Sequence, residues 1–278
     1  MSFYNGTVTG VSKIATGTPA AFCRAVTGGT LTINPHNVRK RGAGGQLHAR
    51  KGTTETTLSL SVVGVAKTDL AKWFPTSTGT QVSGFPDFLV EVDDGVSGRE
   101  FVLTSGQPSN CSIKLDQGDD AEVEVDVEMR FAAFSGYAAG TYAPAYNSVK
   151  GHTVNDVSVT ISGVTENVMS FTLSNDLGAT SRNPLNGKTA GAKTFPAAVT
   201  INGNDPSFSC VTSDEYNVEN LAADDWTAVD VVVTLANGTS AENITVTLDD
   251  WIAENFNFPV TGEDFDGFSH EFRPGDGT

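Results

Sequence analysis

The chain has 278 residues, 29 of them glycine, and a formal net charge of −16. A run of roughly 18 apolar residues, which would suggest a membrane-spanning helix, is absent from the sequence. A charge this negative argues against holding nucleic acid at physiological salt, because the chain repels phosphates. Many Gly, Thr, Ser and Val residues with little helical periodicity predict an all-β class with one large domain or two medium ones.

The N-terminal residues show neither an apolar core segment nor a cleavage site, so no secretory signal is expected. The three cysteines, Cys23, Cys111 and Cys210, lie far apart and outside any metal-ligand spacing. We therefore expect buried or reduced thiols in a protein made in the cytoplasm.

The first predicted strands cover residues 5–14 and 26–33, and a third ends near Gly64. A polar segment, residues 34–57, separates the second from the third and carries four glycines and five basic side chains against one acid. No apolar face runs through it, so it cannot bury itself. We predict a long hairpin arm that docks on the acidic surface of a neighbouring subunit, although phosphate binding by this basic cluster is an alternative. Its basic residues are Arg39, Lys40, Arg41, Arg50 and Lys51.

A short helix is predicted over residues 67–75, because Thr68 can cap its start and Pro75 can end it. Its buried face would hold Leu70, Trp73 and Phe74.

Two hairpins are predicted next. The first joins strands 88–92 and 100–103 around Asp94-Gly95, a turn dipeptide, and the second joins strands 111–115 and 121–131 around an acidic turn. The last strand alternates between apolar residues and carboxylates, so one face belongs to the core. The other face is either an ordinary solvated sheet surface or a wall that must not adhere to what it faces. Its carboxylates are Glu122, Glu124, Asp126 and Glu128.

Residues 133–152 are small and almost uncharged, which is typical of a linker. The predicted division is a first domain at 1–135, a linker at 136–152 and a second domain at 153–278.

The second domain repeats the order of the first. A second arm spans residues 174–196 between β patterns and carries Arg182, Lys188 and Lys193, and a second helix is predicted over 213–223. Residues 90–95 align with 233–238 at an offset of 143, and the last hairpin aligns with residues 256–272 at an offset of 144. An internal duplication explains both offsets.

Motifs for catalysis and metal binding are mostly missing. The glycines of the first arm lack the ending and the setting of a phosphate-binding loop, and no metalloprotease motif or catalytic triad can be read. The acidic turns at 116–120 and 263–266 do not match a calcium-binding loop. Paired acids such as Asp119 and Glu122, or Asp249 and Asp250, suit hydrolysis, but exposed turn acids are commoner. We expect no enzyme, no metal and no cofactor.

A β-sandwich with one short helix and a long arm between early strands resembles the tail tube (major tail) protein of long-tailed bacteriophages, whose fold is shared with contractile-tail tubes and secretion-system tube proteins. The resemblance is carried by the strand–arm–strand units 30–63 and 170–201, the helix 68–74 and the alternating strands 121–131 and 265–272. It covers nearly the whole chain and concerns architecture, without a short diagnostic motif. Many family members carry one such domain. This sequence predicts two tandem tail-tube-like β-sandwich or barrel domains, each with a short helix and a long hairpin arm.

The resemblance implies a structural virion protein whose stacked rings surround a DNA channel, with the arm on the next ring. Two domains per chain imply rings of three chains, and the family implies a tape measure protein and a tail terminator as partners. An acidic wall suits the channel, because cations would hold DNA by its phosphates. The candidate lumen-facing acids are Glu122, Glu124, Asp126, Glu128, Glu263, Asp264 and Asp266.

A protein of a different class is the main alternative: a tandem immunoglobulin-like adhesive module of a virion or cell surface that binds a protein or sugar receptor. Such domains usually have short loops at the ends of the sandwich, so two long arms at equivalent positions favour the tube.

Overall fold

The structure is a computed structural model in which secondary structure and contacts are described for most of the chain. The described residues are 4–15, 18–41, 47–74, 84–93, 98–116, 122–139, 145–146, 151–153, 156–182, 198–212, 228–239, 242–257 and 268–274. The predicted second helix, 213–223, lies outside them.

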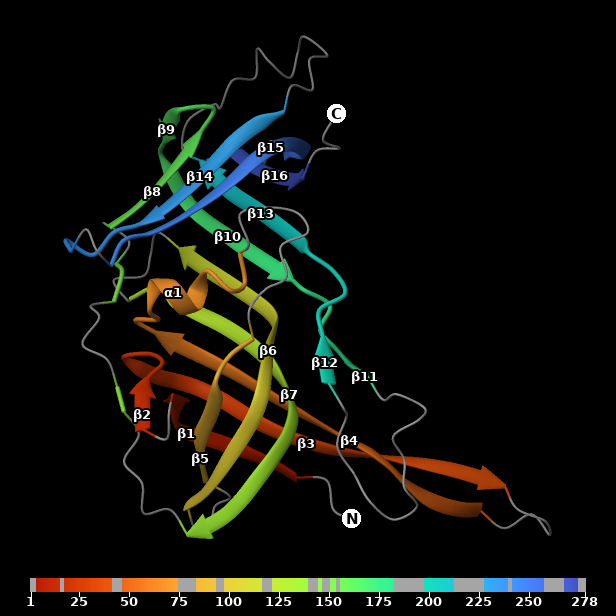
Figure 1. The fold of residues 1–278 in the computed structure, drawn as a ribbon. Coiled ribbons are helices and arrows are strands. Elements are labelled where there is room, and N and C mark those ends of the chain that lie inside the picture. The colour runs from red at the N-terminus through yellow and green to blue at the C-terminus, as the bar shows by residue number, and fades with distance from the viewer. Residues whose placement is uncertain are drawn as a thin grey trace, which may run out of the picture.

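The first half of the chain forms a closed, six-stranded antiparallel barrel (Figure 1). Its strands follow the order β1–β3–β4–β7–β6–β5, and β5 pairs back with β1 to close the ring. This confirms the all-β class. The strands are β1 (Tyr4–Ala15), β3 (Ala25–Arg41), β4 (Leu47–Val63), β5 (Asp87–Asp93), β6 (Gly98–Asp116) and β7 (Glu124–Ala139), with a short strand, β2 (Thr18–Ala21), beside β1.

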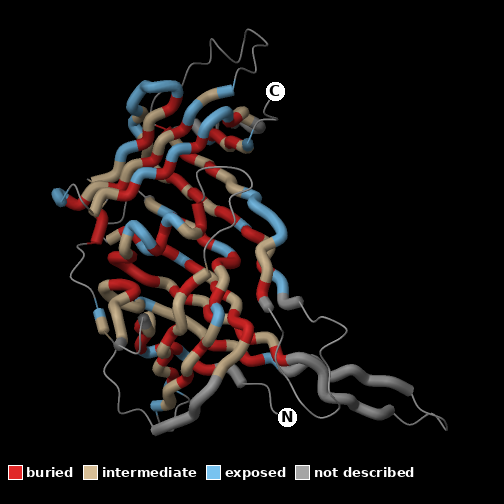
Figure 2. Tube along the Cα trace, viewed as in Figure 1, coloured by how far each residue is buried: buried red, intermediate tan, exposed pale blue. Residues whose placement is uncertain are grey.

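Aromatic side chains fill the barrel. The ring of Phe88 lies 5.3 Å from that of Phe22 and 5.7 Å from that of Phe131, centroid to centroid, in edge-to-face contacts. Trp73 packs on Phe85 at 4.9 Å, and all five residues are buried (Figure 2). These buried rings therefore form the core of the barrel interior.

The described helix α1 (Lys67–Leu70) is shorter than predicted. Thr68 lies inside the helix, so its prediction as the cap is wrong; Ala66 is the N-cap residue and makes no side-chain cap hydrogen bond. Burial fixes the turn instead. The buried Asp69 carboxylate accepts a hydrogen bond from Lys13 Nζ at 2.5 Å. Leu70, Trp73 and Phe74 are buried together, as the sequence predicts.

The second half continues the same sheet, because β10 pairs with β6 of the barrel. From β10 the order runs β13–β16–β15–β14–β8–β9. These strands are β8 (Val157–Ile161), β9 (Val164–Glu166), β10 (Val168–Asp176), β13 (Asp205–Thr212), β14 (Val229–Leu235), β15 (Ile244–Asn257) and β16 (Phe268–Pro274). A separate pair, β11 (Thr180–Arg182) and β12 (Ala198–Thr200), lies beside the barrel (Figure 1).

The two halves repeat one pairing scheme. In chain order, β8, β10, β13, β14, β15 and β16 correspond to β1, β3, β4, β5, β6 and β7. The pairs β10–β13, β13–β16, β15–β16, β14–β15 and β14–β8 each match a pair of the barrel. The counterpart of β1–β3 is the exception: within the described residues β10 pairs with β6 and not with β8.

The β-bulges of the two halves also coincide. The register of β6 against β7 shifts between Pro108 and Asn110, and that of β15 against β16 shifts between Ala253 and Asn255, 145 positions later. Bulges re-aim a strand, so a matching bulge makes matching strands bend alike. The β3–β4 and β10–β13 pairs agree in the same way, with shifts between Val26 and Gly28 and between Val168 and Ser170.

A left-handed residue recurs at the same offset. Ser105 has φ 55° and Asp250 has φ 59°, a conformation that is uncommon for residues other than glycine. The backbone N–H of Ser105 donates to Asp87 Oδ1 at 3.4 Å, and that of Asp250 donates to Asp230 Oδ1 at 3.2 Å. An aspartate at the equivalent position, Asp87 or Asp230, therefore accepts a hydrogen bond from the left-handed residue in each half.

These registers correct two details of the sequence analysis. Residues 100–103 and 111–115 belong to one continuous strand, β6, because the left-handed Ser105 bends the strand without ending it. The single offset of 144 for the last hairpin is wrong by one residue in each strand. Residues of β15 lie 145 positions after their counterparts in β6, and residues of β16 lie 143 positions after theirs in β7. The buried Phe272 thus corresponds to the buried Met129.

Part of the expected linker is ordered backbone. Residues 136–139 form the end of β7. Further on, the N–H of Ala145 donates to Ser12 Oγ at 2.7 Å and the hydroxyl of Tyr146 donates to the Thr9 carbonyl at 3.4 Å. These described parts of the segment 136–152 therefore continue the sheet or lie against β1.

Candidate functional site

The predicted alternation along residues 122–129 is confirmed. Val123, Val125, Val127 and Met129 are buried, whereas Glu124 and Asp126 are exposed and Glu122 and Glu128 are half-exposed. The four carboxylates therefore lie on the outer face of the barrel sheet.

Neighbouring side chains bind each of these carboxylates. Thr27 Oγ1 donates to Glu124, and Ser61 Oγ donates to Asp126. Glu122 forms an ion pair with Arg24, and Arg130 Nε lies 3.6 Å from Glu128 Oε1. The sequence analysis missed these partners. The polar positions of the neighbouring strand β4, which alternate with Leu58, Leu60 and Val62, are a signal for one of them, Ser61.

This polar face crosses from the first half into the second. Strand pairing aligns its residues in rows that run over β4, β7, β6, β10 and β13. One row is Ser59, Glu128, Asn110, Asp176 and Asp205; the next is Ser61, Asp126, Ser112, Ser174 and Ser207. We call this surface the polar sheet face. Hydroxyls, amides and carboxylates make up both rows, so the face offers acceptors and little apolar surface.

A groove of about 700 Å³ lies on the polar sheet face beside the turn that leads from β10 to β11. Its charged lining residues are Asp126, Glu128, Asp176 and Arg130, which leaves an excess of acid. Ala179 and Val199, at the base of the second arm, form a small apolar cluster with Ala132 of β7. The base of that arm therefore packs against the barrel.

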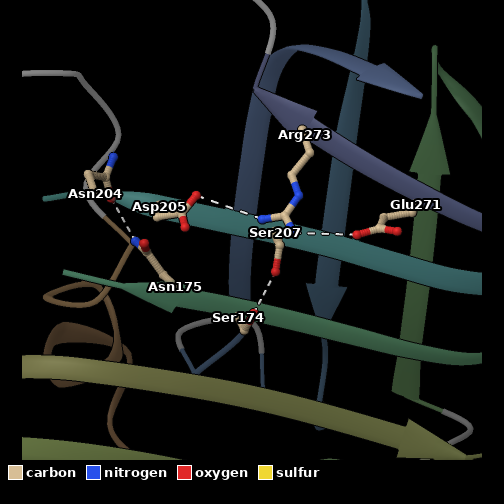
Figure 3. A network of polar contacts seen from close by, with 7 residues as sticks. All are labelled: Ser174, Asn175, Asn204, Asp205, Ser207, Glu271 and Arg273. Atoms are coloured by element: carbon tan, nitrogen blue, oxygen red, sulfur yellow. Dashed lines mark hydrogen bonds and ion pairs between the residues drawn. The ribbon is translucent and has the colours of Figure 1, made fainter. Parts of the chain in front are cut away.

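The far end of the polar sheet face carries a polar network (Figure 3). Ser174 and Ser207 share a hydrogen bond of 2.6 Å between their hydroxyls, and Arg273 lies 3.7 Å from Asp205 and 3.4 Å from Glu271. Asn175, which is buried, donates to Asn204 Oδ1 at 2.8 Å and to the Trp73 carbonyl at 2.6 Å. This last contact ties the second half to the helix region of the barrel.

Both predicted arms begin as paired strands. In the first arm, β3 and β4 stay paired out to Arg41 opposite Leu47, well beyond the barrel, whereas β1 accompanies β3 only to Ile33 and β7 accompanies β4 only from Thr56 (Figure 1). The hairpin is therefore confirmed in its backbone. It carries the five predicted basic residues, whose side chains lie outside the description.

The base of the second arm is the β11–β12 pair, which ends at Arg182 opposite Ala198. Lys188 and Lys193 lie outside the described residues, as do Glu263, Asp264 and Asp266.

The cysteines are free and buried, as predicted. Burial raises the pKa of Cys23 and of Cys210 to about 12, and it also raises the pKa of Cys111. These thiols are therefore poor nucleophiles. The described residues contain no cluster of His, Cys, Asp and Glu side chains that could hold a metal ion.

His270 gives the fold a dependence on pH. It is 1% exposed, its Nε2 lies 3.1 Å from Thr212 Oγ1, and burial lowers its pKa from 6.5 to about 4. The unfolded chain therefore binds more protons between these values, so stability falls as the pH drops from 6.5 towards 4. We expect a loss of about 1–3 kcal/mol over this window. Urea unfolding of the wild type and of His270→Gln at several pH values measures it, and equal slopes for both proteins would contradict the assignment.

A scan against protein-family models gives no match for this sequence, and a search of curated proteins gives none either. Within the described residues, no helix is long and apolar enough to cross a membrane.

Proposed function

We propose that this chain is a structural virion subunit that polymerises into stacked rings, which form the tail tube of a long-tailed bacteriophage. The observation that carries the proposal is the β6–β10 junction. It joins two copies of one pairing scheme edge to edge, so the polar sheet face runs uninterrupted from one copy to the next. A unit that extends its sheet into a second copy of itself can do so repeatedly.

On this proposal the chain holds two tail-tube-like domains that arose by duplication, and it has no enzymatic role. The matching bulges and the matching left-handed residues support the duplication, because such backbone exceptions are too specific to arise twice by chance at one offset. The first arm, with its basic cluster, would reach the next ring and dock on acidic surface there.

The polar sheet face would line the channel. Its carboxylates carry negative charge, and the hydroxyls of Thr27 and Ser61 hold two of them in place. DNA passes such a wall without binding, because few cations are there to displace its counterions. The proposal also includes a tape measure protein and a tail terminator as partners, and a location in the virion tail.

The alternative, a tandem adhesive module, predicts two sandwiches joined by a linker. A closed barrel that shares a sheet with the second half is a different arrangement.

Electron microscopy of the purified chain tests the proposal. We expect hollow tubes, and symmetry analysis should give rings of three chains with true three-fold and approximate six-fold symmetry. The surface potential should show that the six-fold symmetry is only approximate, because the net charge of residues 1–139 is −2 and that of residues 140–278 is −14. Particles that never polymerise would contradict the function, and rings of six whole chains would contradict the two-domain interpretation.

A further inference from the structure

The junction between the two halves uses one part of β6. The N-terminal part of this strand, Gly98–Leu103, pairs with β5, and its C-terminal part, Asn110–Asp116, pairs with β10 along the same edge. Strand β15 is built alike. Its pairing with β14 ends at Trp251, and within the described residues no strand pairs with that edge at 255–257. β15 therefore presents the edge that β6 uses to hold β10.

The strand that receives this edge can also be identified. Residues 170–176 of β10 correspond to residues 28–34 of β3 at the offset of 142 that their bulges fix. In the barrel that part of β3 is occupied: Tyr4–Thr7 of β1 pairs with Thr30–Ile33. The pairing is short, since the rest of β1 runs along β5.

The second half shows what happens when the receiving edge is taken. Val11 opposite Val90 corresponds to Val159 opposite Val233, so residues 4–7 of β1 correspond to 152–155. His152 and Thr153 do not pair with β10. The His152 carbonyl instead accepts from Val123 N at 2.6 Å, and Thr153 bridges to Glu122.

We propose that β15 of one chain pairs with β3 of the next chain, and that residues 4–7 cover this edge of β3 until they are displaced. The inference rests on the proposed function, and it names the contact that links chains within a ring. The first half shows the closed form of the repeat and the second half shows the open form. The donor and acceptor edges differ, so the contact is head-to-tail, which is the arrangement that builds rings or filaments.

When the β6–β10 register is applied to β15 and β3, residues of similar polarity lie opposite each other. Asn110 opposite Asp176 becomes Asn255 opposite Asn34, and Cys111 opposite Asn175 becomes Phe256 opposite Ile33. Asp176 and Asn34 are both exposed, and Ile33 is buried. The new pairing thus places an apolar residue opposite the buried Ile33 and an amide residue opposite the exposed Asn34, as a one-residue slip would not.

A reversible lock tests whether residues 4–7 must leave. Asn5 lies opposite Thr32, and directly opposed residues of antiparallel strands are close enough for a disulfide. The full-length double variant Asn5→Cys/Thr32→Cys, once oxidised, should form no tubes, and reductant should restore them. The matched control is Ser112→Cys/Ser174→Cys, which locks the pairing already made within the chain and should assemble in both states. Normal assembly of the oxidised Asn5/Thr32 variant would overturn the proposal.

A cross-link identifies the new partner. Mixing an Asn34→Cys chain with an Asn255→Cys chain under assembly conditions should give disulfide-linked dimers that neither chain gives alone, and the double variant should give cross-linked species up to the trimer of one ring. The three native thiols are buried and add little background. If wild-type tubes form while no such cross-link appears, the inference fails and the proposed function stands. If the wild type forms no tubes, the function itself fails.

Discussion

Removal of residues 38–52 is expected to leave a folded, soluble protein that no longer forms tubes. Within the described residues, the deleted part of the arm pairs with itself and, at Lys51, with Asn37 of the same hairpin, whereas β1 pairs with β3 only to Ile33 and β7 pairs with β4 only from Thr56. The strand pairing of the barrel is therefore retained. Thermal unfolding should be nearly unchanged while electron microscopy shows no tubes.

Two further variants separate the shape of the arm from its charge. A full-length arm in which all five basic residues are replaced by Gln keeps the hairpin, and it should also assemble poorly if the arm docks on an acidic surface. Single alanine changes can be silent, since an exposed ion pair contributes only about 0–1 kcal/mol. Normal tubes from the shortened chain would rule out a role for the arm in assembly.

Replacing Glu124, Asp126 and Glu128 by Lys is expected to permit assembly but to trap DNA. These side chains lie on the outer face of the sheet, so the core is not disturbed. Each replacement exchanges a carboxylate that repels DNA for a cation that contacts a phosphate. Each such contact steepens the slope of log binding constant against log salt concentration by about 0.9. Co-sedimentation of duplex DNA with tubes at several salt concentrations measures this slope, and DNA ejection should slow in virions carrying the change.

The matched control removes charge without adding cations: Glu124→Gln, Asp126→Asn and Glu128→Gln together. It should assemble and bind DNA far less than the lysine variant. A tube structure that places these positions on its outer surface would refute the channel assignment. The candidates would then be Glu263, Asp264 and Asp266.

Local patterns predicted much of this fold. The alternation along residues 122–129 and the buried face of Leu70, Trp73 and Phe74 follow from periodicity, which neighbouring residues alone determine. The first arm was predictable as a hairpin because a basic, glycine-rich segment cannot bury itself, although the register of its strand pairing was not predicted. The duplication signal in the sequence was also present, but with the wrong register in its last hairpin.

Long-range edges left no local signal. Nothing around Ser170 or Asp116 in the sequence predicts that β10 pairs with β6, because an exposed edge and an edge paired with another strand can carry the same polar residues. The hydroxyl partner of Glu124 also leaves no local signal, because Thr27 contacts Glu124 only once the fold has placed the two residues side by side. The helix begins at Lys67 as predicted, but its cap escaped prediction, because the buried Asp69 pairs with Lys13 and no capping side chain is used.

The junction at β6 and β10 also bears on the rate of assembly. Two repeats held in one chain meet at a high effective concentration, so their contact forms without a bimolecular encounter. A ring built from such chains needs fewer association events than one built from single repeats, and each event costs roughly 4–15 kcal/mol of translational and rotational freedom. Fusion of the repeats thus lowers the nucleation barrier at low subunit concentration. The same fusion fixes the order of the two repeats, because every first half is followed around the ring by a second half.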